Sequence, residues 1–214
     1  MPKTRPADCR LYGFIDAAWL ADRDPAVLTR ALITGGVDLI QVRAKLFTHA
    51  QRVELGLAVV GAARAHPLPV IINDDLDAAF ECGADGVHLG QEDWAGLGGS
   101  RDRVTRLAGL RIVGLSTHSL AQAQAAERDG VDYIGVGPVF RTGTKPAVAP
   151  VGVELVRQVA ARVQLPWFAI GGITLANVDQ VLAAGATRVA VVSAILQADD
   201  VAAAAAAFKA RLGE

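Results

Sequence analysis

Eight short apolar runs, each followed by a polar turn and a longer segment with helical spacing, constrain the fold of this chain more than any other feature. The runs are Leu11–Ile15, Leu39–Val42, Val70–Ile72, Gly86–Leu89, Ile112–Leu115, Tyr133–Val136, Trp167–Ile170 and Val189–Val192. This alternation indicates βα units around a parallel sheet. Because the runs are nearly continuous in apolar character, we expect strands that are covered on both faces.

Helix starts and stops agree with this alternation. Starts are predicted at Asp24-Pro25, Thr48, Ser119, Gly152 and Thr174. Stops are predicted at Gly35-Gly36, Gly83-Ala84, Gly130-Val131 and Gly185-Ala186, where a glycine permits left-handed geometry. The phrases GVDLI, GADGV, GVDYI and GATRV repeat one supersecondary unit loosely, and the alanine run 202–207 predicts a closing helix.

The predicted fold is α/β, a single-domain (β/α)₈ TIM barrel over residues 1–214, in which residues 1–10 form a flexible lead-in. An open doubly wound sheet uses the same alternation and is the competing architecture. Eight units in this length, and no G-x-G-x-x-G turn after the first run, favour the closed barrel.

Charge and cysteine content narrow the classes of function. A formal net charge of -1 and a pI near 6.4 provide no general attraction for nucleic acid or an anionic membrane, so any anion must bind at a built site. Cys9 and Cys82 are predicted to be ordinary buried residues, which suits a reducing cytoplasm. No apolar stretch approaches about 20 residues, so neither export nor a membrane span is expected.

In a barrel, function is expected at the carboxyl ends of the strands, and the second run ends in a polar segment. Strand alternation directs Gln41, Arg43 and Lys45 to one side, which brings an amide and two cations to the barrel mouth. A surface charge pair is the plainer alternative. An unpaired charge within a buried strand would be costly, and this favours the functional interpretation.

Carboxylates follow the third and fourth runs. Mg²⁺ commonly takes one or two protein carboxylates and completes its shell with water and substrate phosphate, so Asp74 and Asp93 are predicted to share a metal with a diphosphate. Helix capping by Asp75 or Asp93 is the alternative. His88 lies within an apolar strand and is interpreted as a hydrogen-bonded core histidine outside the site.

Four further loops are suited to anions. Ser116 stands near a helix start, and residues 141–145 form a long loop with two hydroxyls and a lysine. The seventh run ends at Gly171-Gly172, and the eighth leads into Ser193. Glycines there let the backbone approach a phosphate, although simple turn chemistry would also explain them.

The segments QVRAK, IND at 72–74, GVHLGQED, GLSTHS, YIGVGPVF followed by TGTK, FAIGGI and VAVVSAI resemble the thiamine phosphate synthase family, in order and over nearly the whole chain. The resemblance implies a Mg²⁺-assisted transferase. Its substrates would be 4-amino-2-methyl-5-hydroxymethylpyrimidine diphosphate and a (carboxy)thiazole phosphate. Diphosphate would leave first, and the thiazole nitrogen would capture the resulting cation.

The resemblance also assigns residues to the two substrates. The pyrimidine diphosphate would be held by Gln41, Val42, Arg43, Ala44, Lys45, Asn73, Ser116 and Lys145. The thiazole phosphate would be held by Thr142, Gly143, Thr144, Gly172, Val192 and Ser193. Arg43, Ser116 and Lys145 are the catalytic candidates. The chain departs from many relatives in having Ala147-Val148-Ala149 where an acidic residue is common, and altered loop order is expected there.

Three rival functions remain open. A sister group with the same barrel aromatises the thiazole, a sugar-phosphate epimerase or tryptophan-pathway isomerase would share the last two phosphate loops, and a non-catalytic barrel would only bind the phosphate ligand. Asp74, Asp93 and Lys145 together favour the synthase. Partners are expected to be small-molecule substrates, with a homo-oligomer left open.

Overall fold

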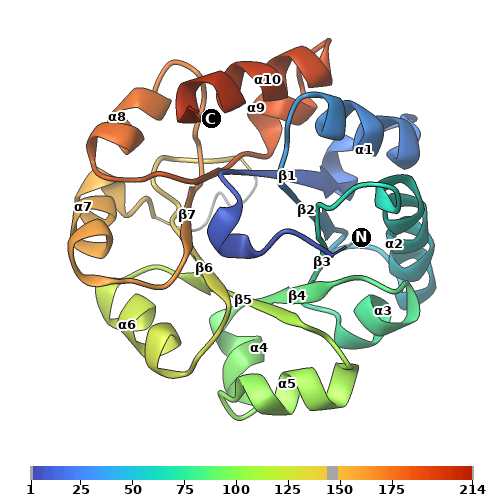
Figure 1. Ribbon diagram of the computed structural model, residues 1–214, viewed down its shortest axis with the longest axis horizontal. Coiled ribbons are helices and arrows are strands. Elements are labelled where there is room, and N and C mark those ends of the chain that lie inside the picture. The colour runs from blue at the N-terminus through green and yellow to red at the C-terminus, as the bar shows by residue number, and fades with distance from the viewer. Residues whose placement is uncertain (1, 144–148, 214) are drawn as a thin grey trace.

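The computed structural model describes residues 2–143 and 149–213, and its strands close into a parallel barrel (Figure 1). The strands follow one another around the barrel in chain order, and β8 pairs with β1. They are β1 (Leu11–Asp16), β2 (Leu39–Arg43), β3 (Val70–Asn73), β4 (Gly86–Leu89), β5 (Ile112–Thr117), β6 (Tyr133–Val136), β7 (Trp167–Ile170) and β8 (Val189–Ala190). The predicted (β/α)₈ barrel is confirmed, and closure excludes the doubly wound sheet.

An outer ring of helices surrounds the barrel (Figure 1). They are α1 (Pro25–Thr34), α2 (His49–Ala63), α3 (Leu76–Glu81), α4 (Gln91–Gly96), α5 (Arg101–Ala108), α6 (Leu120–Arg128), α7 (Gly152–Arg162), α8 (Val178–Ala183), α9 (Ser193–Leu196) and α10 (Val201–Leu212), with 3₁₀ turns η1 (Pro6–Asp8) and η2 (Ala17–Trp19). No helix in residues 2–143 and 149–213 is long and apolar enough to cross a bilayer.

The caps explain where several of these helices begin. Asp24, Thr48 and Ser119 each accept a hydrogen bond from a backbone N–H of the first turn, as predicted. The start predicted at Thr174 is displaced to Asn177, because the Asn177 side chain accepts from the Thr174 N–H and holds the preceding residues in a turn. A helix was expected after the fourth strand, but its division into α4 and α5 and the short α9 were not predicted.

Two layers of core account for strands that are apolar on both faces. The outer layer packs between strands and helices, and the inner layer fills the barrel. Within the inner layer, the rings of Tyr12, Tyr133 and Phe168 make edge-to-face contacts with centroids 5.2 to 5.7 Å apart. Both cysteines are buried and free, as predicted. The barrel is therefore packed with side chains and is not a pore.

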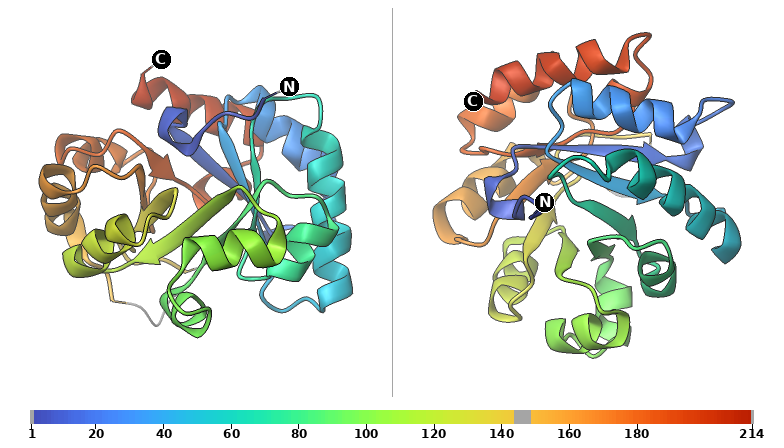
Figure 2. Two further views of the ribbon diagram at one scale, coloured as in Figure 1. Left: turned by 60° about the horizontal axis from the view of Figure 1, so that its bottom comes forward. Right: turned by 45° about the vertical axis from the view of Figure 1, so that its right-hand side comes forward.

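Residues 2–10, expected to be a flexible lead-in, lie across the amino-terminal end of the barrel. Figure 1 shows η1 over the centre of the strand ring. The Thr4 N–H donates to the Pro67 carbonyl at 2.7 Å, and the Arg188 guanidinium donates to the Ala7 carbonyl at 2.6 Å. Both termini lie at this end of the molecule (Figure 2). The carboxyl ends of the strands face the other way.

Gly86 tests how tightly neighbouring strands pack. A Cβ at Gly86 would lie 2.2 Å from the Ile112 carbonyl oxygen on β5, so Gly86→Ala must displace backbone. We expect this variant to lower the free energy of unfolding by about 2 kcal/mol or more, as overpacking does. Urea denaturation followed by circular dichroism measures the change.

Gly61→Ala provides the matched control, because a Cβ at this position in α2 meets nothing within 4 Å. Here the free energy of unfolding should rise by about 0.5–1 kcal/mol, since alanine restricts the unfolded chain and favours helix. Equal stability of the two variants would contradict the packing argument.

Candidate active site

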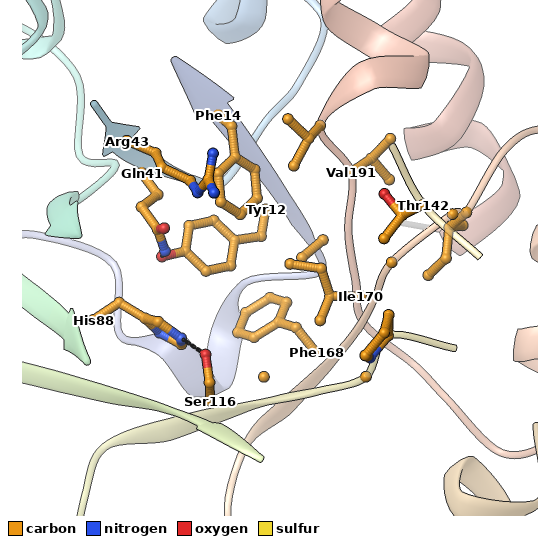
Figure 3. A pocket seen from close by; sticks show the side chains of 18 of the residues that line it. Tyr12, Phe14, Gln41, Arg43, His88, Ser116, Thr142, Phe168, Ile170 and Val191 are labelled. Atoms are coloured by element: carbon orange, nitrogen blue, oxygen red, sulfur yellow. Dashed lines mark hydrogen bonds between the residues drawn. The ribbon is translucent and has the colours of Figure 1, made fainter. Parts of the chain in front are cut away.

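A cavity opens at the carboxyl ends of the strands, above the inner aromatic layer (Figure 3). Its lower walls are apolar rings from β1 and β7, Tyr12, Phe14 and Phe168. Of the residues predicted for the site, it brings together Gln41, Arg43, Asn73, Ser116, Thr142, Gly172, Val192 and Ser193. Loops that are far apart in sequence therefore meet around one space, as expected at the functional end of a barrel.

A second hollow lies beside the cavity and is strongly charged. Its lining includes Lys45, Asn73 and Asp74, together with Arg52 and Asp75. The Lys45 ammonium lies 3.4 Å from an Asp74 carboxylate oxygen, and both side chains are partly exposed. Since an exposed pair of this kind contributes little to stability, both charges remain available to a ligand. Asn73 lines the cavity and this charged hollow alike.

Val42 and Ala44, two residues assigned through the family resemblance, are both buried, and of the two only Ala44 lines one of these spaces, the charged hollow. The side chains of Val42 and Ala44 are buried in the outer core layer, against the helices. This is the geometry that strand alternation dictates, because Gln41 and Arg43 face the interior. Val42 can therefore contribute to a ligand site through its backbone.

Arg43 is held in place by a buried carboxylate. Its guanidinium donates to Asp16 Oδ2 at 2.7 Å, and only 12% of the Arg43 side chain and 2% of the Asp16 side chain are exposed. The other Asp16 oxygen accepts from the Ala18 N–H at 3.0 Å, which starts η2. Asp16 and Arg43 are register partners at the ends of β1 and β2. The pair fixes one cation at the cavity wall.

A chain of hydrogen bonds crosses the barrel at the base of the cavity, and Figure 3 shows its members Gln41, Tyr12, His88 and Ser116. Gln41 Nε2 donates to the Tyr12 hydroxyl at 2.6 Å, and that hydroxyl lies 2.7 Å from the Tyr133 hydroxyl. His88 Nδ1 lies 3.1 Å from the Tyr133 hydroxyl, and His88 Nε2 lies 2.9 Å from Ser116 Oγ. We name this the polar chain. Its two ends, Gln41 and Ser116, line the cavity, as do Tyr12 and His88.

The phenols of the polar chain keep their protons. Burial raises the pKa of Tyr12 well above its ordinary value, and hydrogen bonds with Tyr133 and Gln41 offset only part of that rise. Burial, together with the neighbouring Tyr12, likewise raises the pKa of Tyr133. Both groups therefore act as neutral hydrogen-bond donors and acceptors.

The two predicted metal residues occupy different settings. Asp74 has a positive φ of 65°, and its N–H donates to the His88 carbonyl at 2.9 Å, which ties the loop after β3 to β4. Such backbone outliers are common at functional sites. Asp93 lies exposed in the first turn of α4 and is not among the described residues that line the charged hollow.

Helix capping accounts for Asp75 but not for Asp93. Asp75 accepts from the Ala78 N–H at the start of α3 and also binds Arg52. Burial opposes ionisation of Asp75, but these hydrogen bonds outweigh it and lower the pKa. The residue that precedes α4 is Gly90, which has no side chain to cap it. The carboxylate of Asp93 is thus not used as the N-cap of its helix.

Backbone forms the other side of the cavity. Gly172 has a φ of 64°, and a Cβ there would lie 2.5 Å from the Arg141 carbonyl oxygen, so glycine is required for both conformation and space. Val192 and Ser193 stand at the start of the short α9, directly after β8. Gly143 is exposed, and the predicted residues Thr144 and Lys145 lie outside the described part of the chain.

Sequence reasoning missed several residues that line or support the cavity. Asp16 lies one residue beyond the predicted first strand, and it joins the site through its pairing with Arg43 on β2, which the structure reveals. His88 is hydrogen-bonded, as predicted, but it also lines the cavity from which it was excluded. His118 lines the cavity too, with its ring against the Gly137 carbonyl.

The Asp16–Arg43 pair allows a direct measurement of coupling. We expect a double-mutant cycle with Asp16→Asn and Arg43→Met to give a coupling free energy above about 1.5 kcal/mol, because each single change leaves a buried partner unpaired. The amide oxygen in Asp16→Asn would still accept from the Ala18 N–H, so the cap of η2 is preserved. Urea denaturation of the four proteins provides the values.

The exposed pair Glu154–Arg157, at 3.2 Å on α7, is the matched control. Glu154→Gln and Arg157→Met should couple by less than about 0.5 kcal/mol, as exposed ion pairs do. Similar coupling in the two cycles would show that Asp16 does not hold Arg43 through a buried charge interaction.

Comparison with known proteins agrees with this geometry. A family model described as thiamine monophosphate synthase matches residues 11–195. The thiamine-phosphate synthase of Chloroflexus aurantiacus is 42% identical over 204 residues, covering 95% of this chain and 92% of the relative. That of Thermus thermophilus is 45% identical over 185 residues, covering 86% and 87%.

Solved structures give the same result. Thiamine phosphate pyrophosphorylase from Pyrococcus furiosus matches with a TM-score of 0.84 and 30% identity, covering 97% of this chain and 96% of that one. A 3-hexulose-6-phosphate synthase, at a TM-score of 0.64 and 22% identity, shares the fold alone. With its barrel, its cavity and these matches, the chain belongs to the thiamine monophosphate synthase family and is a transferase.

Proposed function

We propose that this transferase joins 4-amino-2-methyl-5-hydroxymethylpyrimidine diphosphate to a (carboxy)thiazole phosphate and releases diphosphate. The observation that carries the proposal is the position of Asn73, which lines both the aromatic cavity and the charged hollow. A substrate with an aromatic ring, one methylene group and a diphosphate needs two such adjoining environments. The ring would occupy the cavity, and the diphosphate would reach the hollow.

Magnesium is the cation we propose at the edge of this hollow, with Asp74, which lines it, and Asp93, from the first turn of α4, as its protein ligands. Two protein carboxylates are sufficient for this ion. Among the described residues, no group of three His, Cys, Asp or Glu side chains could hold a metal by itself. Mg²⁺ commonly binds one or two carboxylates and completes its shell with water and substrate phosphate, so a full protein cage is not required. When bound, it would neutralise part of the diphosphate charge.

Departure of the diphosphate is the step that the charged residues assist. The C–O bond breaks with both electrons leaving on oxygen, so negative charge grows on the diphosphate and a pyrimidine-methyl cation remains. Arg43, fixed by Asp16, would stabilise the growing charge without reorganising, and the more exposed Lys45 would add a second positive charge. We assign Lys145 and Ser116 to the same part of the reaction as hydrogen-bond donors.

Capture of the cation needs no base in the bond-forming step, because the thiazole nitrogen supplies a lone pair. What it needs is orientation and exclusion of water, which would otherwise compete as a nucleophile. The rings of Tyr12, Phe14 and Phe168 supply the apolar walls. The thiazole phosphate would be held at the opposite side by Gly172, Val192 and Ser193, joined by residues 142–144.

Measurement of diphosphate release tests the proposal. Wild-type protein should release diphosphate only when both substrates and Mg²⁺ are present. We expect Asp93→Ala to reduce kcat/KM by about 100-fold or more, because a metal that stabilises transition-state charge contributes several kcal/mol. Glu92→Ala changes the neighbouring exposed carboxylate of α4 and should leave the rate within about twofold.

Two outcomes would contradict the proposal. Binding of either substrate without diphosphate release would indicate a barrel that only holds a phosphate ligand, or an aromatase. Equal loss of rate in Asp93→Ala and Glu92→Ala would remove Asp93 from the metal site, and the reaction would then need a different ligand beside Asp74.

A further inference from the structure

The polar chain at the base of the cavity has a direction. A phenol has one hydrogen, so each hydroxyl in a continuous chain donates to one side and accepts from the other. Gln41 Nε2 donates to the Tyr12 hydroxyl, and the Tyr12 hydrogen is therefore directed to the Tyr133 hydroxyl. Tyr133 in turn donates to His88 Nδ1.

This direction fixes the tautomer of His88. Because Nδ1 accepts from Tyr133, the ring hydrogen of a neutral imidazole lies on Nε2, where it donates to Ser116 Oγ. A doubly protonated His88 would point a hydrogen at Tyr133 and leave the Tyr133 hydrogen without an acceptor in the chain. When every hydroxyl hydrogen of the chain has an acceptor, each hydrogen bond is donated in the same direction, from Gln41 towards Ser116.

The two ends of the chain then present opposite groups to the cavity. At one end, Gln41 uses one of its two amide hydrogens on Tyr12, which sets the orientation of the amide and leaves its carbonyl oxygen and its second N–H for a ligand. At the other end, Ser116 Oγ accepts from His88, so its own hydrogen is left for a ligand. The cavity thus combines a hydrogen-bond acceptor at β2 with a donor at β5.

Packing holds the centre of the chain rigidly. A Cβ at Gly114 would lie 2.2 Å from the Tyr133 ring, so glycine at this position of β5 provides the space in which the ring lies. The Phe168 ring contacts both phenols edge to face, at 5.2 and 5.7 Å. Both tyrosines are at most 2% exposed. A buried, fully paired chain of this kind resists reversal, because reversal would require every member to change together.

We propose that Tyr12, Tyr133 and His88 are positioning residues whose shared polarity makes the cavity select an aminopyrimidine over the corresponding oxopyrimidine. The exocyclic amino group would donate to the Gln41 carbonyl, and a ring nitrogen would accept from the Ser116 hydroxyl. A carbonyl in place of the amino group would face the Gln41 oxygen, and two acceptors repel. The inference rests on the proposed function for the identity of the substrate.

Competition between two pyrimidine diphosphates tests the selection. The probes are the 4-amino compound and the same diphosphate with a 4-oxo group, each supplied with thiazole phosphate and Mg²⁺. Wild-type protein should prefer the amino compound by about 100-fold or more in kcat/KM, because a site built for a hydrogen bond rejects a mismatched partner strongly. Tyr133→Phe, which removes only the central hydroxyl, should reduce this preference at least about tenfold.

Phe168→Leu is the matched control, since it disturbs the same ring cluster without touching a hydrogen bond of the chain. Its activity should fall on both compounds while their ratio stays as in the wild type. A wild-type protein that uses the two compounds equally overturns the inference. So does a Tyr133→Phe variant with the wild-type ratio.

Nitrogen-15 NMR of His88 gives a readout that is independent of turnover. The signal is assigned by its loss in His88→Gln, among the four histidines of the chain. We expect Nδ1 without a hydrogen and Nε2 with one, in the wild type and in Phe168→Leu, and a tautomer mixture in Tyr133→Phe. The opposite tautomer in the wild type overturns the polarity. Failure to release diphosphate from either pyrimidine would instead contradict the proposed function.

Discussion

The centre of this barrel contains two phenols that are out of reach of solvent, and much of the site depends on how their hydroxyls are paired. Tyr12 and Tyr133 fill the space enclosed by the strands, where an unpaired hydroxyl would be costly. Each therefore requires a polar neighbour at a fixed position. Gln41 on β2 and His88 on β4 meet that requirement, and each also reaches the cavity. Core packing and ligand recognition are thus served by the same side chains.

Charge at the cavity is arranged in two different ways. Arg43 is buried against Asp16 and cannot move without breaking a desolvated pair, whereas Lys45 is half exposed and pairs only loosely with Asp74. A fixed cation beside a mobile one suits a leaving group whose charge increases as it departs. In the proposed reaction, Arg43 would already be in place before the diphosphate departs, and Lys45 would be free to adjust to it.

The sequence predicted the barrel closely because strand and helix signals are local. Capping by Asp24, Thr48 and Ser119, and left-handed glycines such as Gly83 and Gly130, stand where the pattern indicated. The last strand was predicted too long, because Val191 and Val192 are apolar yet lie between the end of β8 and the start of α9. Apolar character alone does not distinguish a strand from the turn that follows it.

Site residues that depend on register were harder to predict. Asp16 matters because it lies opposite Arg43 on the neighbouring strand. The register between two strands cannot be predicted from the sequence of either strand alone. His88 was correctly expected to be hydrogen-bonded, but its partners come from β5 and β6, far along the chain. Val42 was assigned through family resemblance, and alternation along β2 shows that its side chain faces the helices.

The ends of the chain are joined at the closed side of the barrel. Arg10 donates from its guanidinium to the Leu212 carbonyl at 2.7 Å, just before β1 and at the last turn of α10. New termini opened elsewhere, with residues 2 and 213 linked, would leave the order of strands around the ring unchanged. A domain fused at either present end would sit away from the mouth and leave the entry of substrates unobstructed. The architecture therefore separates the place where the chain can be extended from the place where it binds.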